Sequence, residues 1–226
     1  MEVKLVEGIL SVLLGVISSL AVVIFVEWQR QPHLMLTVAD PSDQEYRGLP
    51  TPAQIMRCLR IRVRNRELPW ALRWMRREPA QNCLGTIQFL YLDGTKYFME
   101  SMPARWAGST EATPLLGRIT MGEVVHGNIE LWDTARLSIV SKMDIPAGEQ
   151  EDIDVAVRCD DDVDAYGFNN ESYRTNWRNE RWRVPKGRYL VEVTIRSAGQ
   201  KISKRFLLNN DSRRDQFRLE EGPLST

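Results

Sequence analysis

The stretch Cys58-Leu-Arg-Ile-Arg-Val-Arg-Asn65 alternates strictly between apolar and charged side chains. Leu59, Ile61 and Val63 share one face of an extended chain, while the arginines between them share the other face. A period of two is typical of a β-strand that buries one face and exposes the other. The stretch therefore predicts a half-buried strand.

Other runs on both sides of this stretch show similar patterns, and together they predict a mainly β domain. We expect strands over residues 33–38, 86–92, 95–99, 127–132, 137–143, 152–159, 189–195 and 201–208. Asp93-Gly94 separates two of them and is a strong signal for a hairpin turn. In the strand 152–159, the odd-numbered side chains from Ile153 to Cys159 are expected to point inward together. Many short strands separated by turns favour a β-sandwich over a fold that alternates strands with helices.

Short motifs in these strands resemble a known class of sandwich. The run Pro185-Lys-Gly-Arg-Tyr-Leu-Val-Glu-Val193 resembles the opening of the penultimate strand in many immunoglobulin-like domains, and Pro146-Ala-Gly-Glu149 is similar to a loop that precedes an earlier strand. The resemblance implies an immunoglobulin-like β-sandwich with the ring of Tyr189 in its core. Residues 59–65, with Ala80-x-Asn-Cys83, also resemble bacterial extracellular adhesion-like repeats. The resemblance lacks the Cys-Trp-Cys spacing of antibody domains and carries no activity with it.

The N-terminal region predicts one transmembrane α-helix. Residues 8–26 contain no charged side chain, and as a helix they span about 28 Å, close to the thickness of a bilayer's hydrocarbon core. Trp28 and Arg30 follow where an interfacial aromatic and a snorkelling cation are expected. The run is longer than the apolar core of a signal peptide, and Val26-Glu-Trp28 is no small-x-small cleavage site. We therefore expect an uncleaved anchor.

These expectations divide the chain into three parts. Residues 1–32 form the N-terminal tail and transmembrane helix, residues 33–208 form the sandwich with an insertion near 66–82, and residues 209–226 form a polar tail that is expected to fray. Before the helix the only basic side chain is Lys4, whereas several arginines follow it. Basic residues favour the cytoplasmic side, so we expect a cytoplasmic domain, with the opposite orientation as the alternative.

Within the expected membrane helix, Ser11, Gly15 and Ser19 recur every four residues. Small residues at this interval let two helix backbones approach closely, which is how many transmembrane helices associate. The stripe predicts a homo-oligomer or a partner helix in the membrane. The alternative is that small residues are simply common in such helices.

The segment from Arg64 to Pro79 stands where a simple sandwich has a short loop, and it is rich in arginine and tryptophan. Between residues 57 and 77 the only acidic side chain is Glu67. If residues 69–78 form a short helix, Trp70 and Trp74 share one side of it. The arginines on the rest of its surface are Arg73, Arg76 and Arg77. Tryptophan at headgroup depth and arginine on anionic lipid are typical of an interfacial element, so this segment predicts a membrane-surface or anion-binding site.

Two other interpretations of this segment stay open. Trp70 and Trp74 can be core side chains that cap the sandwich, with exposed arginines around them. Arginine and aromatic side chains can also bind nucleic acid through phosphate contacts and base stacking, but no nucleic-acid-binding fold signature accompanies them here. We therefore expect membrane lipid and a protein partner, and no nucleic acid.

A run of acidic side chains follows the strand at 152–159. Its carboxylates recur at the oxygen-ligand spacing of a calcium loop, at Asp160, Asp162, Asp164 and Glu171. Ala165 stands where such a loop needs glycine. The alternative to a metal site is a solvated acidic loop that pairs with the arginines of residues 58–65 across the molecule.

The composition argues against several classes of function but does not identify the function. Lys plus Arg and Asp plus Glu both total 30, so the net charge gives no argument for nucleic acid. Cys58, Cys83 and Cys159 show no Cys-x-x-Cys spacing. Cys58 and Cys159 are expected to be small buried hydrophobes, with one disulfide as the alternative. The sequence has two histidines and no known catalytic motif. We therefore expect no enzyme and no cofactor.

Together these patterns predict a non-catalytic, single-pass membrane protein whose sandwich recruits or senses a partner at the membrane surface. The alternative is a ligand-triggered effector that oligomerises through its transmembrane helix. A hydrolase is a third class, and it requires an acidic or histidine side chain whose loss abolishes turnover.

Overall fold

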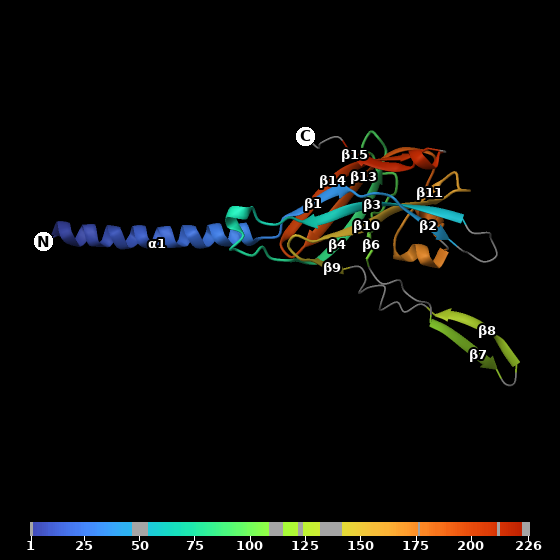
Figure 1. Ribbon diagram of the computed structural model, residues 1–226, viewed down its shortest axis with the longest axis horizontal. Helices are drawn as coiled ribbons and strands as arrows, with labels where there is room; N and C mark the ends of the chain where they lie inside the picture. Colours follow the sequence, from blue (N-terminus) through green and yellow to red (C-terminus); the bar gives the residue numbers. More distant parts are fainter. Residues whose placement is uncertain are drawn as a thin grey trace.

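The computed structural model describes residues 2–46, 54–108, 115–121, 124–131, 142–175, 177–211 and 213–222. This part of the chain is mainly β, with two antiparallel sheets and the long helix α1 (Glu2–Arg30). Figure 1 shows α1 projecting from one end of the β-structure. The apolar run expected at 8–26 lies inside α1. The part of α1 from Val12 to Arg30 is long and apolar enough to cross a membrane.

The two sheets contain strands from the whole length of the domain. The first sheet comprises β1 (Leu34–Val38), β2 (Ser42–Tyr46), β3 (Gln54–Asn65), β6 (Arg105–Trp106), β10 (Gln150–Cys159), β11 (Ala165–Gly167) and β12 (Arg183–Val184). The second comprises β4 (Ala80–Leu90), β5 (Met102–Pro103), β9 (Lys142–Ile145), β13 (Gly187–Ser197), β14 (Gln200–Asn210) and β15 (Arg218–Glu221). β7 (Leu115–Met121) pairs with β8 (Val124–Leu131). The 3-10 helices are η1 (Trp70–Leu72), η2 (Asn170–Thr175), η3 (Glu180–Trp182) and η4 (Arg214–Gln216).

The sheets face each other across one apolar core. The first has the order β1-β3-β10-β11-β12 and the second the order β15-β14-β13-β4-β5. Ile61 and Val63 of β3 are fully buried, as the alternation predicts, and they share the core with Phe89, Val191 and Phe206 of the second sheet. Arg60, Arg62 and Arg64, which alternate with the apolar residues of β3, lie on the outer face of this strand. The predicted β-sandwich architecture therefore follows from the inward faces of both sheets.

The strands expected near the C-terminus form a hairpin of β13 and β14. Ser197 pairs with Gln200 across a two-residue turn, in which Gly199 has a φ of +81°. Glycine suits this left-handed conformation because it has no Cβ. At the other end of β13 the ring of Tyr189 is buried, as expected, and packs edge-on against Tyr97 with ring centroids 5.2 Å apart.

The strand β10 departs from the expectation of a single inward face. Its register against β3 shifts at a bulge between Asp154 and Ala156. Ile153 enters the main core, whereas Val157 and Cys159 enter a second, smaller cluster. The extra residue of a bulge reverses which side chains point inward. All four odd-numbered side chains are buried, as expected, but they are divided between two clusters.

The turn expected at Asp93-Gly94 is present, but the strand after it is not continuous. The backbone N–H of Thr95 donates to Oδ1 of Asp93 (2.8 Å), and Gly94 has a φ of +86°. Beyond the turn, pairing is limited to one isolated bridge between Leu90 and Lys96. Of the two strands expected at 127–132 and 137–143, β8 accounts for the first and β9 overlaps the second, while residues 137–141 lie outside the described part of the chain.

The C-terminal segment is not the frayed tail that its polarity suggests. β15 pairs with β14, with Leu219 opposite Leu208. Phe217 is fully buried and Leu219 is 6% exposed, so two apolar side chains hold the segment against the second sheet. The predicted domain boundary at residue 208 is therefore wrong, and the sandwich extends at least to Glu221.

Candidate functional site

The junction between α1 and the sandwich is built around Asn65, the last residue of β3, which is fully buried. Its side-chain oxygen accepts a hydrogen bond from the backbone N–H of His33 (3.0 Å). Its amide nitrogen donates to the carbonyls of Glu78 (3.0 Å) and Ile145 (3.1 Å). One side chain therefore ties together the chain leaving α1, the end of the insertion and the end of β9.

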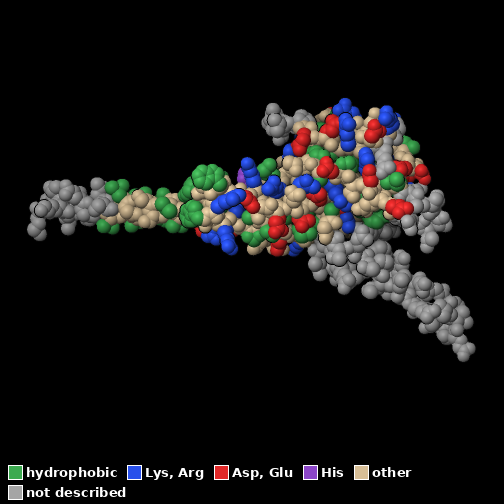
Figure 2. All heavy atoms as spheres, in the orientation of Figure 1, with side chains coloured by type: hydrophobic (Ala, Val, Ile, Leu, Met, Phe, Trp, Pro, Cys, Tyr) green, Lys and Arg blue, Asp and Glu red, His purple; other side chains and the backbone are tan. Residues whose placement is uncertain are grey.

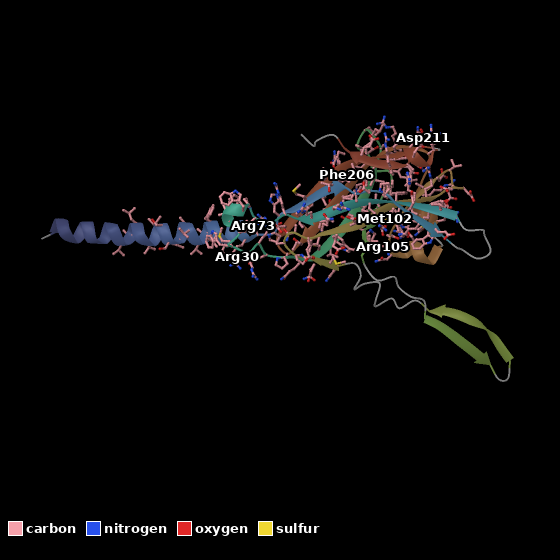
Figure 3. The ribbon with its side chains drawn as sticks, in the orientation of Figure 1. Arg30, Arg73, Met102, Arg105, Phe206 and Asp211 are labelled. Atoms are coloured by element: carbon pink, nitrogen blue, oxygen red, sulfur yellow. The ribbon has the colours of Figure 1, made fainter. Side chains whose placement is uncertain are left out.

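The insertion also holds the last turn of α1 directly. The backbone N–H of Glu78 donates to the carbonyl of Arg30 (2.8 Å), and the guanidinium of Arg77 donates to the carbonyl of Gln31 (2.9 Å). Carbonyls at a helix C-terminus have no partner within the helix, so these bonds cap α1 from outside. Figure 3 shows Arg30 of α1 and Arg73 of the insertion at this same end of the molecule.

Three tryptophans lie at the junction with their side chains exposed. Trp28 is 65% exposed, Trp70 is 84% exposed and Trp74 is 76% exposed. The interpretation that Trp70 and Trp74 cap the core is therefore wrong. Leu68 and Met75, each 6% exposed, fasten the insertion to the protein instead. In Figure 2, apolar side chains drawn green and basic side chains drawn blue gather where α1 meets the domain.

The insertion does not form the helix expected over 69–78. It contains the single 3-10 turn η1, followed by a turn and a bend. The N–H of Glu78 bonds to α1 and is thus unavailable to a carbonyl four residues earlier. Nucleating an isolated short helix is costly, and Pro79 disfavours helical backbone at Glu78. The buried anchors Leu68 and Met75, and not helical spacing, therefore place the tryptophans.

The arginines of β3 differ in what they face on the neighbouring strand β10. The opposed pairs are Arg60 with Asp154, Arg62 with Asp152 and Arg64 with Gln150. Arg60 and Arg62 form ion pairs with their aspartates, with nitrogen–oxygen distances of 2.8 Å and 3.0 Å. Arg64 faces a neutral amide and has no ion pair with any described residue. The ion pairs along β3 therefore end at Arg62, and Arg64, which is nearer to the junction, faces no acidic side chain on β10.

Sequence reasoning missed the most buried ion pair among the described residues. Asp154 is fully buried and is paired with both Arg60 and Arg105, and Arg105 is itself 4% exposed. The guanidinium of Arg105 lies 5.1 Å from the ring centroid of Phe168. The available signal was an aspartate among buried apolar residues of β10, which requires a cation as partner. Nothing local in the sequence identifies which cation it is.

The three arginines predicted for a membrane-surface site all lie in this insertion. Arg73 and Arg76 are exposed, and Arg73 is 3.7 Å from Glu67. Arg77 is half-buried between the insertion and the chain that leaves α1. Burial and the nearby charge of Arg66 lower the pKa of Arg77. The structure therefore places these arginines at the same end of the domain as the three tryptophans.

The acidic loop predicted as a calcium site has different partners. Asp162 is paired with Arg178 (3.0 Å), and Asp164 is paired with Arg183. Within the described ranges, no group of three or more acidic, histidine or cysteine side chains is arranged to hold a metal ion. Asp160, Asp162, Asp164 and Glu171 are thus not brought together as a ligand set. The alternative pairing with the arginines of residues 58–65 is also wrong for Asp162 and Asp164, because their partners come from residues after 170.

The small residues of α1 differ in how well they suit association between helices. Beside Gly15 there is open space on the surface of the helix. The hydroxyl of Ser19 donates to the carbonyl of Gly15 (2.9 Å), so its hydrogen is used within α1. The side chain of Ser11 lies outside the described part of the structure. Association through this stripe stays a prediction, with close packing at Gly15 as its main physical basis.

The three cysteines are free and buried, as expected for Cys58 and Cys159, and the disulfide alternative is wrong. Burial raises the pKa of Cys58 to about 12 and the pKa values of Cys83 and Cys159 to about 11. A thiol with so high a pKa holds almost no thiolate at neutral pH. These thiols therefore contribute packing and not nucleophilic chemistry.

Comparison with protein-family models, with curated proteins and with solved structures finds no match for this chain. The junction of α1, the insertion and the end of β3 is therefore the candidate site on its geometry alone.

Proposed function

We propose that this protein is a single-pass, non-catalytic membrane protein that presents a sandwich domain as a binding or scaffold unit at the bilayer surface. The observation that carries the proposal is the junction, where exposed Trp28, Trp70 and Trp74 lie beside the capped end of α1. Tryptophan side chains favour the membrane–water interface, and arginines favour anionic headgroups. A helix of spanning length that ends beside such side chains suits a domain held against the lipid.

A binding role fits the described side chains better than catalysis does. The cysteine thiols are buried with raised pKa values, and Asp162 and Asp164 are engaged by arginines. The motif around Tyr189 and the buried position of its ring support an immunoglobulin-like assignment for the sandwich. The partner proposed here is a protein recruited at the membrane surface.

The proposed orientation places the domain in the cytoplasm. Arg30 and Arg47 follow the apolar run within about 20 residues of its end, and basic residues at that distance from a membrane helix favour the cytoplasmic side. Fusing a green fluorescent protein or an alkaline phosphatase to the C-terminus tests this directly. A fluorescent fusion with an inactive phosphatase fusion supports the orientation, and the reverse pattern contradicts it.

A direct test of membrane contact uses the tryptophans as probes. Full-length protein is reconstituted in nanodiscs whose lipids carry brominated acyl chains, which quench tryptophans that enter the lipid. We expect the quenched fluorescence to fall in the double variant Trp70→Phe/Trp74→Phe. The matched control is Trp106→Phe, which removes a fully buried ring and leaves the quenched component in place. Equal quenching in the parent and in the double variant would refute contact between the insertion and lipid.

The second candidate function is a ligand-triggered effector that associates through α1. The open space beside Gly15 and the hydrogen-bonded junction favour it, because a movement of the domain would be transmitted to the helix. Replacing Ser11, Gly15 and Ser19 together by Leu should weaken helix association by about 1–2 kcal/mol, measured by energy transfer between labelled copies in vesicles. The matched control replaces Val16, on a different face, by Leu. Unchanged energy transfer in the triple variant leaves plain anchoring as the role of α1.

A further inference from the structure

A cavity of about 550 Å³ opens between the last turn of α1, the end of β3 and the insertion. The polar residues in its lining are Gln29, His33, Arg64, Arg66, Glu67 and Arg77. Glu67 is the one carboxylate of this lining, and it lies 3.7 Å from Arg73, which is outside the cavity. Three arginines against one already engaged carboxylate leave the cavity with an excess of positive charge.

Arg77, which lines this cavity, carries one buried hydrogen-bond donor without a partner among the described residues. One terminal nitrogen donates to the carbonyl of Gln31, whereas Nε is buried and has no partner among the described residues. A buried donor without an acceptor is costly, and the adjacent charge of Arg66 adds repulsion to that cost. An anion bound between Arg66 and Arg77 would remove the repulsion between their charges.

The same molecule neutralises comparable arginines elsewhere. On β3, Arg60 and Arg62 each have an aspartate on β10 at ion-pair distance. Arg64, Arg66 and Arg77 form no ion pair within the part of the chain that the structure describes. The lack of acidic partners is therefore local to the end of the domain from which α1 leaves.

We propose that this cavity binds a phosphate group, and that the headgroup of an anionic phospholipid is the source within reach. Guanidinium groups bind phosphate oxygens through parallel N–H donors, and Arg64, Arg66 and Arg77 bring three such groups to this lining. Gln29, in the last turn of α1, forms one wall, and Trp28 lines an adjoining cavity that also contains Arg77. The source of the phosphate rests on the proposed function, because the cavity lies at headgroup depth only if α1 spans the bilayer.

The test uses full-length protein in neutral detergent micelles and measures bound ligand by native mass spectrometry. The probes are phosphatidylglycerol, phosphatidylcholine and, separately, inorganic phosphate. We expect phosphatidylglycerol to bind more tightly than phosphatidylcholine. Arg77→Gln and Arg66→Gln should each weaken its binding by about tenfold or more, as expected for loss of a charge-assisted hydrogen bond.

The matched control is Arg188→Gln, which removes the same charge from an exposed side chain at the start of β13, outside this cavity, and should change binding less than about twofold. An equal loss in Arg188→Gln, or equal binding of both lipids, overturns the proposal in favour of diffuse surface charge. Arg66→Gln guards against misfolding, because the Arg66 side chain, unlike that of Arg77, donates no described hydrogen bond to the junction.

The two phosphate sources give different results in the same assay. Inorganic phosphate that binds more weakly than phosphatidylglycerol assigns the site to lipid, and the reverse order with the same arginine dependence assigns it to free phosphate. Failure of the brominated-lipid experiment with phosphate binding retained would reject the membrane placement and keep the site. Loss of arginine-dependent binding with quenching retained would reject the site and keep the placement.

Discussion

Arginine has a different role at each of the two ends of β3. Toward the middle of the sheet, Arg60 and Arg62 face Asp154 and Asp152 on β10 at ion-pair distance. At the end nearest α1, Arg64 faces Gln150 on β10. Arg66 follows the strand and lines a cavity. A buried charge needs an oppositely charged partner within the protein. A solvent-accessible charge does not, and it therefore stays available to bind a ligand. The contrast suggests that arginine serves the fold at one end of the strand and recognition at the other.

The largest expected effect is at the paired end. Replacing Asp154 by Ala leaves Arg60 and Arg105 without their shared carboxylate in a buried position. Removing one partner of a buried ion pair costs about 3–5 kcal/mol. We expect a loss of that size in the free energy of unfolding, measured by urea titration of full-length protein in micelles with circular dichroism as the signal.

The matched control is Asp152→Ala, which removes the partner of Arg62 at a more exposed position. Pairs of that kind contribute about 0–1 kcal/mol, so the control should unfold close to the parent. Equal losses in the two variants would mean that burial does not distinguish the pairs, and the comparison between the ends of β3 would lose its physical basis.

The next effect concerns Asn65, the residue that ends β3 beside α1. Asn65→Ala removes three hydrogen bonds that join His33, Glu78 and Ile145. With two carbonyls and one N–H left without this partner, we expect a loss of about 2–4 kcal/mol. Hydrogen exchange should rise first at the insertion and at the chain leaving α1, while β13 and β14 stay protected.

A second variant at this position tests the assignment of its hydrogen bonds. Asn65→Asp keeps an acceptor for the N–H of His33 but turns a carboxylate oxygen toward the two carbonyls, so it should be at least as destabilising as Asn65→Ala at neutral pH. An aspartate variant as stable as the parent would contradict the donor role of Asn65.

The strands of the central sandwich were predictable because their signal is local. A period of two over residues 58–65 depends only on which side chains alternate, and it correctly identifies Ile61 and Val63 as buried. The bulge at Asp154 and the pairing of Asp154 with Arg105 depend on register between strands distant in sequence. No local pattern carries that information.

The candidate site was predictable in composition but not in construction. Arginine and tryptophan between residues 64 and 79 correctly indicate an exposed element, and Trp70 and Trp74 are exposed. The helix expected there is wrong, because the backbone near Glu78 bonds to α1. The role of Asn65 was also missed, since an asparagine at the end of an alternating run is more often a simple strand terminator.

The smallest expected effect is at the open end. Trp70→Ala/Trp74→Ala removes two side chains that are 84% and 76% exposed, so the free energy of unfolding in micelles should change by less than about 0.5 kcal/mol for each. Leu68→Ala, in the same insertion but 6% exposed, is the control and should cost about 2–5 kcal/mol. If the tryptophan variant were destabilised as much as the Leu68 variant, the insertion would be part of the fold's support. A near-neutral result, combined with loss of brominated-lipid quenching, would instead mean that these rings are kept for what they contact outside the domain.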